Sequence, residues 1–524
     1  MKLMIFIHKV ILSLFLCLLV VATLNAQTKP PAYLDNYVQR VQEQFEVPGI
    51  AIAIVKDGKV VLARGYGVKK LGESNPVDDQ TLFGIASNTK AFTATALAIL
   101  VEEGKLEWDA PVIRYLPWFQ LSDPYVTAEI TIRDLLVHRS GLGLGAGDLL
   151  WWPPSTYDRK EIVQRLRFIP LATSFRSTYA YDNVLYMVAG EVIETISGKS
   201  WEEFIATRIL TRLGMSDSNV RHSEAGRGTR AASPHARIDG TVRVVSPFAS
   251  DNTNPAGGIN STARDMSKWL IVQLDSGRIS KEDRLFSPAS TRDLWTIVTP
   301  RKIAEPPSEL PVLRKEFWGY ALGFGVNDYH GYKLVSHTGG LPGYVSRVAM
   351  IPSLKLGVAV LTNQESSAAF DAITYFILDH YLHAPKTDWL KAYQSIVKRE
   401  GSQTLDYEQE VMNRRNKNSQ PALPLSSYCG TFRDNWYGEM TIFQEQDKIV
   451  MRFLATPSLV GDLEHYQYDS FICRWRDREL RADAFVTFAL NPFGGIDQVK
   501  MRAVSPATDF SFDFQDLLFL PAVQ

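Results

Sequence analysis

Apolar residues in residues 27–385 fall into runs of two lengths, one typical of strands and one typical of helices. Strand-length apolar runs occupy 49–55, 60–65, 322–326, 333–337, 346–351 and 356–362. Longer runs at 31–45, 83–101, 184–196 and 369–382 have the length and composition of helices. The pattern therefore predicts an α+β domain over 27–385, with an antiparallel sheet flanked by helices and the functional site at their seam.

A polar, charged stretch at 386–424 predicts a linker, and a second pattern begins after it. Apolar and polar residues then alternate in runs separated by turn residues, which is typical of antiparallel strands. These runs are 440–444, 449–453, 471–475, 485–490, 499–502 and 510–514. Residues 425–524 are thus predicted to form a small all-β domain of barrel or sandwich type.

The first 26 residues have the pattern of a secretory signal peptide: an early lysine, a short apolar core and Ala26 before the expected cleavage point. An uncleaved anchor is the alternative, although the apolar run is short for a membrane span. The expected location is periplasmic or secreted, with no stable membrane insertion after the signal is removed. Export permits a disulfide between Cys429 and Cys473, but two separate small apolar side chains are the favoured interpretation.

Acidic and basic residues nearly balance, with a formal net charge of -1, and no basic stripe is present. Nucleic acid is therefore not an expected partner. The histidines lack metal-ligand spacing, so neither a metal nor another cofactor is expected.

The strongest chemical signal is Ser87 followed by Lys90 at the start of an alanine-rich apolar helix. Residues three apart share a helix face, so the hydroxyl and the amine are expected side by side. An apolar setting lowers the pKa of a lysine, and a neutral amine can activate a serine nucleophile. A helix-capping serine beside a lysine that reaches solvent is the plainer alternative. Ser395 and Lys398 have the same spacing but lie in a polar stretch, where nothing would desolvate the lysine.

Two further clusters favour the catalytic interpretation. Tyr181-Asp-Asn183 precedes a second apolar helix, and His337-Thr338-Gly339-Gly340 follows a strand-like run. Taken singly, each is explained as a buried tyrosine with a capping asparagine, or a histidine in a glycine turn. Together and in this order, the three motifs point to one site.

With these motifs, the chain resembles the serine penicillin-recognising family, which includes class C β-lactamases, D-alanyl-D-alanine carboxypeptidases, D-aminopeptidases and related esterases. The family marks are Ser-x-x-Lys, Tyr-x-Asn and Lys/His-Thr-Gly, and the resemblance covers about 30–385. The third motif begins with His337, where β-lactamases carry a lysine. In this position the chain resembles the D-peptidases and esterases of the family. The histidine also weakens the case for binding a β-lactam carboxylate.

The resemblance implies an acyl-enzyme on Ser87, with Lys90 and Tyr181 sharing the proton transfers in an order that the sequence leaves open. It places Asn183, His337, Thr338 and Gly339 around the substrate, and the backbone N–H groups of Ser87 and Gly340 in the oxyanion hole. The expected substrate is a D-amino-acid peptide, an amide or a small ester. The alternatives are a class C-like β-lactamase and a penicillin sensor that is acylated without turnover.

Three other features receive weaker interpretations. Trp151 and Trp152 follow a glycine-rich loop and are either a wall of the substrate cleft or loop packing. His138-Arg-Ser140-Gly141 is more typical of a scaffold turn than of a nucleophile. Tyr428-Cys-Gly-Thr-Phe432 resembles the start of lipocalin-like domains, and this C-terminal domain either covers the cleft or mediates self-association into a homo-oligomer.

Overall fold

Eight strands form the sheet of the first domain in the computed structural model, which describes residues 29–522. The predicted signal peptide, 1–26, lies outside the described residues. Each strand is antiparallel to its neighbours, in the order β2-β1-β12-β11-β10-β9-β8-β7, so the N-terminal hairpin lies beside the last strand. The strands are β1 (Gly49–Lys56), β2 (Lys59–Gly67), β7 (Thr299–Pro300), β8 (Trp318–Tyr320), β9 (Gly325–Tyr329), β10 (Tyr332–Leu341), β11 (Tyr344–Ile351) and β12 (Leu356–Thr362).

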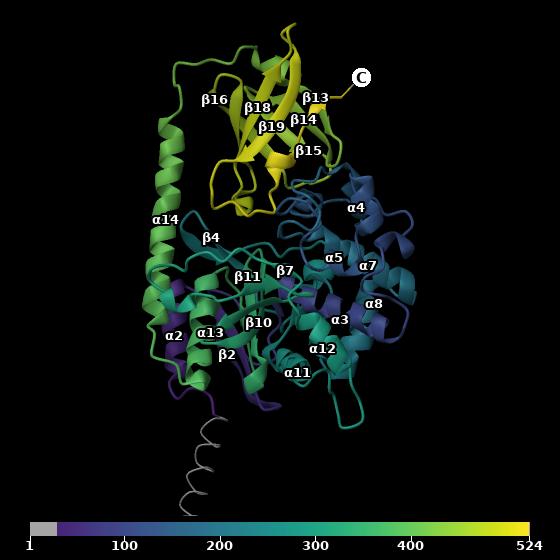
Figure 1. The fold of residues 1–524 in the computed structure, drawn as a ribbon. Coiled ribbons are helices and arrows are strands. Elements are labelled where there is room, and N and C mark those ends of the chain that lie inside the picture. The colour runs from purple at the N-terminus through teal and green to yellow at the C-terminus, as the bar shows by residue number, and fades with distance from the viewer. Residues whose placement is uncertain (1–28, 523–524) are drawn as a thin grey trace, which may run out of the picture.

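Both faces of this sheet are covered by helices, and β1 shows why. Successive side chains of a strand point to opposite faces. Ile50, Ile52 and Ile54 pack with helices α2 (Leu34–Phe45) and α13 (Ser367–Leu382) in one core. Ala51 and Ala53 belong to the other core, together with helices α3 (Thr89–Glu102) and α11 (Ala263–Leu274). Figure 1 shows the two helix layers on opposite sides of the sheet, which confirms the predicted α+β architecture.

The chain between β2 and β7 is mostly helical, as predicted. Helices α3 and α7 pack against each other, and nearly every residue of α3 is buried. Two short strand pairs interrupt the helices: β3 (Phe83–Gly84) with β6 (Asn260–Ser261), and β4 (His235–Ile238) with β5 (Thr241–Val244). The other helices are α4 (Pro124–Glu129), α5 (Ile132–Leu135), α6 (Arg159–Arg165), α7 (Val184–Ser197), α8 (Trp201–Ile205), α9 (Thr211–Leu213), α10 (Asn254–Gly257) and α12 (Pro288–Trp295).

The segment predicted as a linker is largely one helix of 25 residues, α14 (Trp389–Asn413). Its first turns bury apolar side chains, and Trp389 stacks on Tyr375 of α13 with ring centroids 4.7 Å apart. The remainder of α14 is exposed and polar, which explains why the composition resembled a linker. Figure 1 shows α14 running along the first domain toward the second.

The second domain is a nearly closed barrel of eight antiparallel strands, ordered β19-β18-β17-β16-β15-β14-β13-β20. Val499 of β19 exchanges two backbone hydrogen bonds with Phe519, of 2.8 and 3.1 Å, which brings the two ends of the sheet together. The strands are β13 (Gly430–Asp434), β14 (Gly438–Glu445), β15 (Lys448–Phe453), β16 (Val460–Gln467), β17 (Ser470–Trp475), β18 (Ala484–Leu490), β19 (Ile496–Ala503) and β20 (Leu520–Pro521).

Two features of this domain test predictions made from the sequence. The predicted strand at 510–514 is wrong: the segment is a loop that leads into a 3₁₀ turn over Phe514–Asp516. Its polar side chains bind the first domain, so the alternating pattern does not mark a sheet face. Cys429 and Cys473 are both free thiols, and Cys473 is buried in the barrel.

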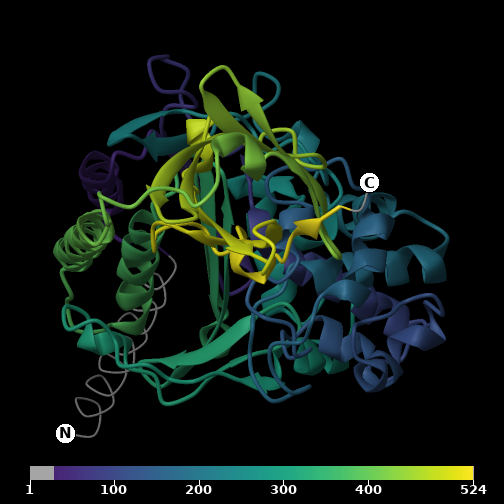
Figure 2. The same cartoon turned by 90° about the horizontal axis from the view of Figure 1, so that it is seen from above.

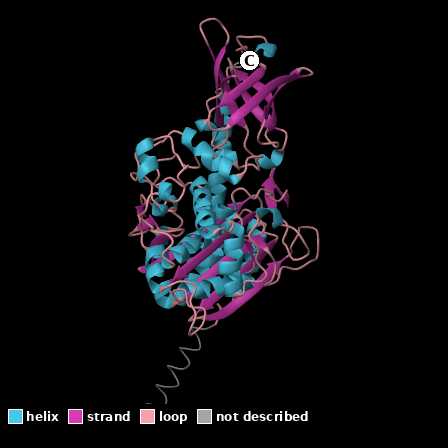
Figure 3. Ribbon diagram, turned by 90° about the vertical axis from the view of Figure 1, so that its right-hand side faces the viewer, coloured by secondary structure: helices cyan, strands magenta, loops and turns pink. Residues whose placement is uncertain are grey.

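The barrel stands on the first domain, as the side view in Figure 3 and the view from above in Figure 2 show. Polar contacts join the two domains at several points. The Arg165 guanidinium donates to the carbonyl of Trp436 at 3.1 Å, and the Thr156 amide donates to the carbonyl of Ala455 at 2.8 Å. Within residues 29–522, no helix has the length and apolar character that crossing a bilayer requires.

Candidate active site

Ser87 and Lys90 lie side by side where the sheet meets the helical region. Ser87 occupies a 3₁₀ turn, Ala86–Asn88, directly before α3, and its Oγ is 3.2 Å from Lys90 Nζ. Ala86 has a φ of 49°, in the left-handed region that residues other than glycine seldom adopt. The turn ahead of α3 thus presents Ser87 from a strained backbone, a feature often found at functional sites.

The Lys90 side chain is entirely buried, yet its amine has several partners. Nζ donates to Asn183 Oδ1 at 2.7 Å and to the carbonyl of Ala256 at 3.0 Å. Burial lowers the pKa of Lys90 from 10.5 to about 7, while the carboxyl of Asp148 acts in the opposite direction. At neutral pH, therefore, a large fraction of this amine is unprotonated and able to accept a proton.

Tyr181 lies on the other side of the lysine. Lys90 Nζ is 4.9 Å from the centroid of the Tyr181 ring. Burial raises the pKa of the Tyr181 phenol well above its usual value, and a hydrogen bond with Ser87 lowers it only in part. The phenol therefore keeps its proton at neutral pH. The Ser87 hydroxyl, the Lys90 amine and the Tyr181 phenol therefore lie together, although the sequence separates the first two from the third.

A buried scaffold holds the Tyr181–Asn183 segment in place. The Asp182 amide donates to His138 Nδ1 at 3.0 Å, and Ser140 Oγ donates to the Asp182 carboxyl at 3.1 Å. His138 and Ser140 therefore support the site, in keeping with the scaffold interpretation of their motif.

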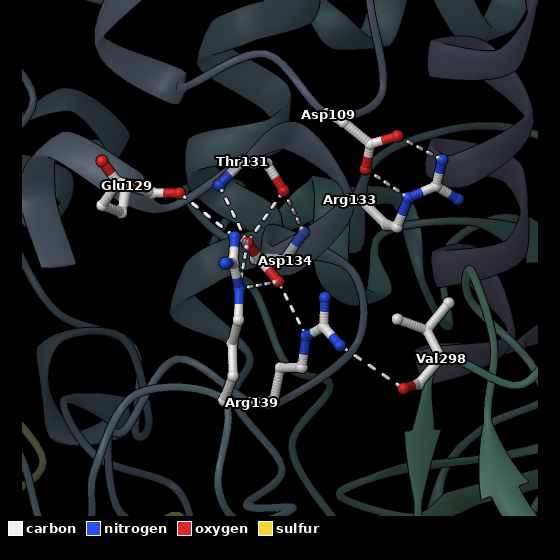
Figure 4. A network of polar contacts seen from close by, with 8 residues as sticks. Asp109, Glu129, Thr131, Arg133, Asp134, Arg139 and Val298 are labelled. Atoms are coloured by element: carbon white, nitrogen blue, oxygen red, sulfur yellow. Dashed lines mark hydrogen bonds and ion pairs between the residues drawn. The ribbon is translucent and has the colours of Figure 1, made fainter.

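An ion-pair network anchors that scaffold in turn (Figure 4). The buried Asp134 carboxylate accepts from Thr131, which caps helix α5. It also pairs with Arg139 at 2.7 Å and with Arg176 at 2.6 Å. Because three donors from different loops converge on one buried carboxylate, the 131–140 segment has a fixed path toward the site.

His337 forms one side of the site on strand β10 and has two hydrogen-bond partners. Its Nδ1 is 2.6 Å from the carbonyl of Thr338, so this nitrogen carries the proton and donates. Its Nε2 then accepts from the Tyr320 hydroxyl at 2.7 Å. Burial lowers the pKa of His337 to about 3, so the ring is neutral at physiological pH.

The glycines after His337 allow the strand to approach the nucleophile turn. A Cβ on Gly339 would overlap the carbonyl oxygen of Ile85, whereas Gly340 faces open space. Ser346 of β11 reinforces the approach, because its hydroxyl donates to the Ile85 carbonyl at 2.7 Å. Thr338 and Gly340 on this strand are exposed, and Ser87 is half-buried.

Both tryptophans pack against neighbouring side chains of the first domain. Trp151 is buried, and its indole N–H donates to Asp148 Oδ1 at 2.8 Å, so it belongs to the packing under the site. Trp152 is half-buried and stacks on Phe248 with ring centroids 5.4 Å apart.

Sequence reasoning missed Asp148 and Ser511. The Asn183 side-chain amide donates to Asp148 Oδ2 at 2.8 Å, and Ser511 of the second domain donates to the same oxygen at 2.9 Å. Only the glycine-rich loop before Asp148 hinted at a close approach of another segment. Within residues 29–522, no group of three or more His, Cys, Asp or Glu side chains is arranged to hold a metal ion.

Comparison with known proteins matches each of the two domains to a family model. Residues 34–382 match the family described as Beta-lactamase, and residues 414–521 match a domain of unknown function, DUF3471. The chain is 29% identical over 445 residues to an unguisins hydrolase, ungD, of Aspergillus violaceofuscus, covering 80% of this chain and 77% of that protein. It is 26% identical over 373 residues to protein flp of Staphylococcus aureus, covering 69% of each.

Solved structures share the fold. The octameric penicillin-binding protein homologue from Pyrococcus abyssi aligns with a TM-score of 0.58 and 23% identity, over 93% of this chain and 99% of that one. A D-amino acid amidase from Ochrobactrum anthropi aligns with a TM-score of 0.55 and 22% identity, over 66% and 98%. The family match over most of the first domain, together with the architecture around Ser87, shows that this chain belongs to the beta-lactamase family of serine hydrolases.

Proposed function

We propose that the protein is an exported hydrolase that forms an acyl-enzyme on Ser87. The observation that carries the proposal is the buried amine of Lys90, 3.2 Å from Ser87 Oγ and with a pKa lowered to about 7. A serine hydroxyl is a weak nucleophile unless a base lies within hydrogen-bond reach, and Lys90 meets that condition.

The pKa directions favour one assignment of the proton transfers. Neutral Lys90 removes the Ser87 proton as Oγ attacks the substrate carbonyl, giving a tetrahedral oxyanion and a lysine ammonium. Tyr181, which still holds its proton, donates to the leaving amine or alcohol as the carbonyl–leaving-group bond breaks, and Lys90 returns a proton to the phenolate. Water then attacks the ester of Ser87, with the same groups acting in reverse, and releases the acid.

The backbone N–H groups of Ser87 and Gly340 are proposed to bind the oxyanion, with Thr338 and Gly339 lining the substrate strand. Donors of this kind lower the barrier because they bind the charge that develops in the transition state. Asn183 holds Lys90 in place, and the neutral His337 ring accepts from the Tyr320 hydroxyl.

D-Amino-acid peptides and amides, or small esters, are the proposed substrates. Support comes from the neutral state of His337, which supplies no positive charge for the carboxylate of a β-lactam. The relative named as an unguisins hydrolase is consistent with a hydrolytic reaction, and the D-amino acid amidase shares the fold.

A turnover panel tests this proposal. It compares a D-Ala-D-Ala peptide, D-amino-acid amides, a chromogenic cephalosporin and short acyl esters, with Ser87→Ala and Ser395→Ala as matched variants. We expect amides or esters to be turned over, with activity lost in Ser87→Ala and retained in Ser395→Ala. Preferential cephalosporin turnover would indicate a β-lactamase, and a stable Ser87 adduct without turnover would indicate a sensor.

Export is proposed from residues 1–26 and is tested separately. The mature protein recovered from the periplasm or medium should begin at Gln27, whereas a protein that begins at Met1 would contradict cleavage. Self-association through the C-terminal domain is also proposed, since one relative is described as octameric. Light scattering on the intact protein should then give a mass above that of one chain.

A further inference from the structure

A loop of the second domain, 505–516, reaches the site in the first domain. Ser511 and Asp513 on this loop are buried, and both bind residues that precede Trp151. The Phe510 ring meets the Tyr181 ring edge-on, with centroids 6.1 Å apart. The contact therefore extends to residues beside the nucleophile and is not confined to the rim of the domain interface.

The glycine-rich loop of the first domain is shaped to receive this segment. Gly145 has a φ of 69°, and a Cβ there would lie 2.8 Å from the carbonyl oxygen of Phe510. The Asp513 carboxylate accepts from the backbone amides of Gly147 and Leu149 at 2.6 and 3.0 Å. These contacts fix the backbone on both sides of Asp148.

Asp148 then links the loop to the catalytic lysine. One of its carboxylate oxygens, Oδ2, accepts from Ser511 Oγ at 2.9 Å and from Asn183 Nδ2 at 2.8 Å. The other end of the Asn183 amide, Oδ1, accepts from Lys90 Nζ at 2.7 Å. A continuous chain of hydrogen bonds thus runs from the second domain to the amine beside Ser87.

The chemistry of each group decides which one donates and which one accepts along this series of hydrogen bonds. An asparagine amide has one accepting and one donating end. Burial raises the pKa of Asp148 to about 7, yet both of its oxygens accept hydrogen bonds, Oδ1 from the Trp151 indole and Oδ2 from Asn183 and Ser511. Asp148 therefore directs the NH₂ of Asn183 toward itself and leaves the oxygen for Lys90. Without the Asp148 carboxyl, no other group in this series of hydrogen bonds would keep the Asn183 amide from turning its NH₂ toward Lys90.

We propose that the C-terminal domain is a working part of the hydrolytic site, in which Ser511 and Asp148 are positioning residues that orient Asn183 and, through it, Lys90. This role rests on the proposed function of Ser87 and Lys90. It assigns to the second domain a task in the reaction itself.

Removal of one hydroxyl tests the proposal in the full-length protein. With p-nitrophenyl acetate as the probe, Ser511→Ala should lower kcat about tenfold, equivalent to about 1.4 kcal/mol in the barrier, and leave KM within about twofold. Ser511→Thr keeps the hydroxyl and should recover most of the rate. The matched control is Tyr157→Phe, which removes an interdomain hydrogen bond to the Tyr437 carbonyl away from Asp148 and should leave kcat unchanged.

Two results would overturn the inference: a kcat of Ser511→Ala within twofold of the unaltered protein, or an equal loss in Tyr157→Phe, which would mean that only general domain contact matters. If Ser511→Ala fails to fold, a second comparison decides. Asp148→Asn keeps the shape of the side chain but replaces one of its two accepting oxygens with an NH₂, so it should lower kcat about tenfold and leave KM within about twofold. A kcat within twofold of that of the unaltered protein would contradict the link. If the unaltered protein is never acylated at Ser87, the proposed function itself fails.

Discussion

Replacing Lys90 with methionine should change how the stability of the protein depends on pH. The amine is wholly buried, and burial lowers its pKa from 10.5 to about 7. Between these two values, the unfolded chain holds a proton on Lys90 that the folded protein does not hold. The free energy of unfolding therefore rises with pH across this window, and the gain is absent at and below pH 7.

The size of the effect follows from the shift. One pKa unit corresponds to about 1.36 kcal/mol, so the linkage gives about 2 kcal/mol of added stability between pH 7 and pH 9. Lys90→Met has no such proton and should lose this gain. Burial raises the pKa of Asp148 to about 7, and the Lys90 charge opposes this shift. The substitution therefore raises the pKa of that carboxyl further, which widens the difference.

Urea unfolding at pH 7, 8 and 9, followed by tryptophan fluorescence, measures the difference. The matched control is Lys398→Met, which removes an exposed lysine with the same spacing from a serine. The control should parallel the unaltered protein, while Lys90→Met should diverge from it by about 2 kcal/mol over the range. Parallel curves for all three proteins would refute the lowered pKa and, with it, the neutral amine as base.

Three further predictions concern activity. Because Lys90 must be unprotonated to act as base, kcat/KM should rise about tenfold per pH unit below about pH 7 and level off above it, and a profile flat from pH 5 to 8 would contradict this. Gly339→Ala should lower both the melting temperature and the activity because a Cβ there overlaps the Ile85 carbonyl, whereas Gly340→Ala faces open space and should keep its fold. Incubation with a chelator should leave turnover intact, and a loss that is restored by added metal would show that a metal ion takes part.

Much of the fold and the centre of the site could be predicted because their signals are local. The Ser87–Lys90 pair needs only helical spacing and an apolar run, and the main strands of the first sheet follow from short apolar segments. The charge state of His337 could not be predicted, because it depends on burial and on the Tyr320 hydroxyl from a different strand.

The parts that the sequence concealed depend on contacts between distant segments. Ser511 binds Asp148 across 363 residues of chain, and no local pattern marks such a pair. Alternating aromatic residues at 510–514 predicted a strand, whereas the segment is a loop bound to the first domain. Helix α14 was not predicted because only its first turns are buried, so most of its sequence is as polar as that of a linker.

The most direct test of the account is the mass of the protein during reaction with an activated ester or amide. Rapid acid quenching, followed by peptide mapping, should find one acyl group on the peptide that contains Ser87 and none on the peptide that contains Ser395. The Ser87→Ala variant should show no adduct and no turnover. An acyl group on another residue, or undiminished turnover by Ser87→Ala, would contradict the central claim.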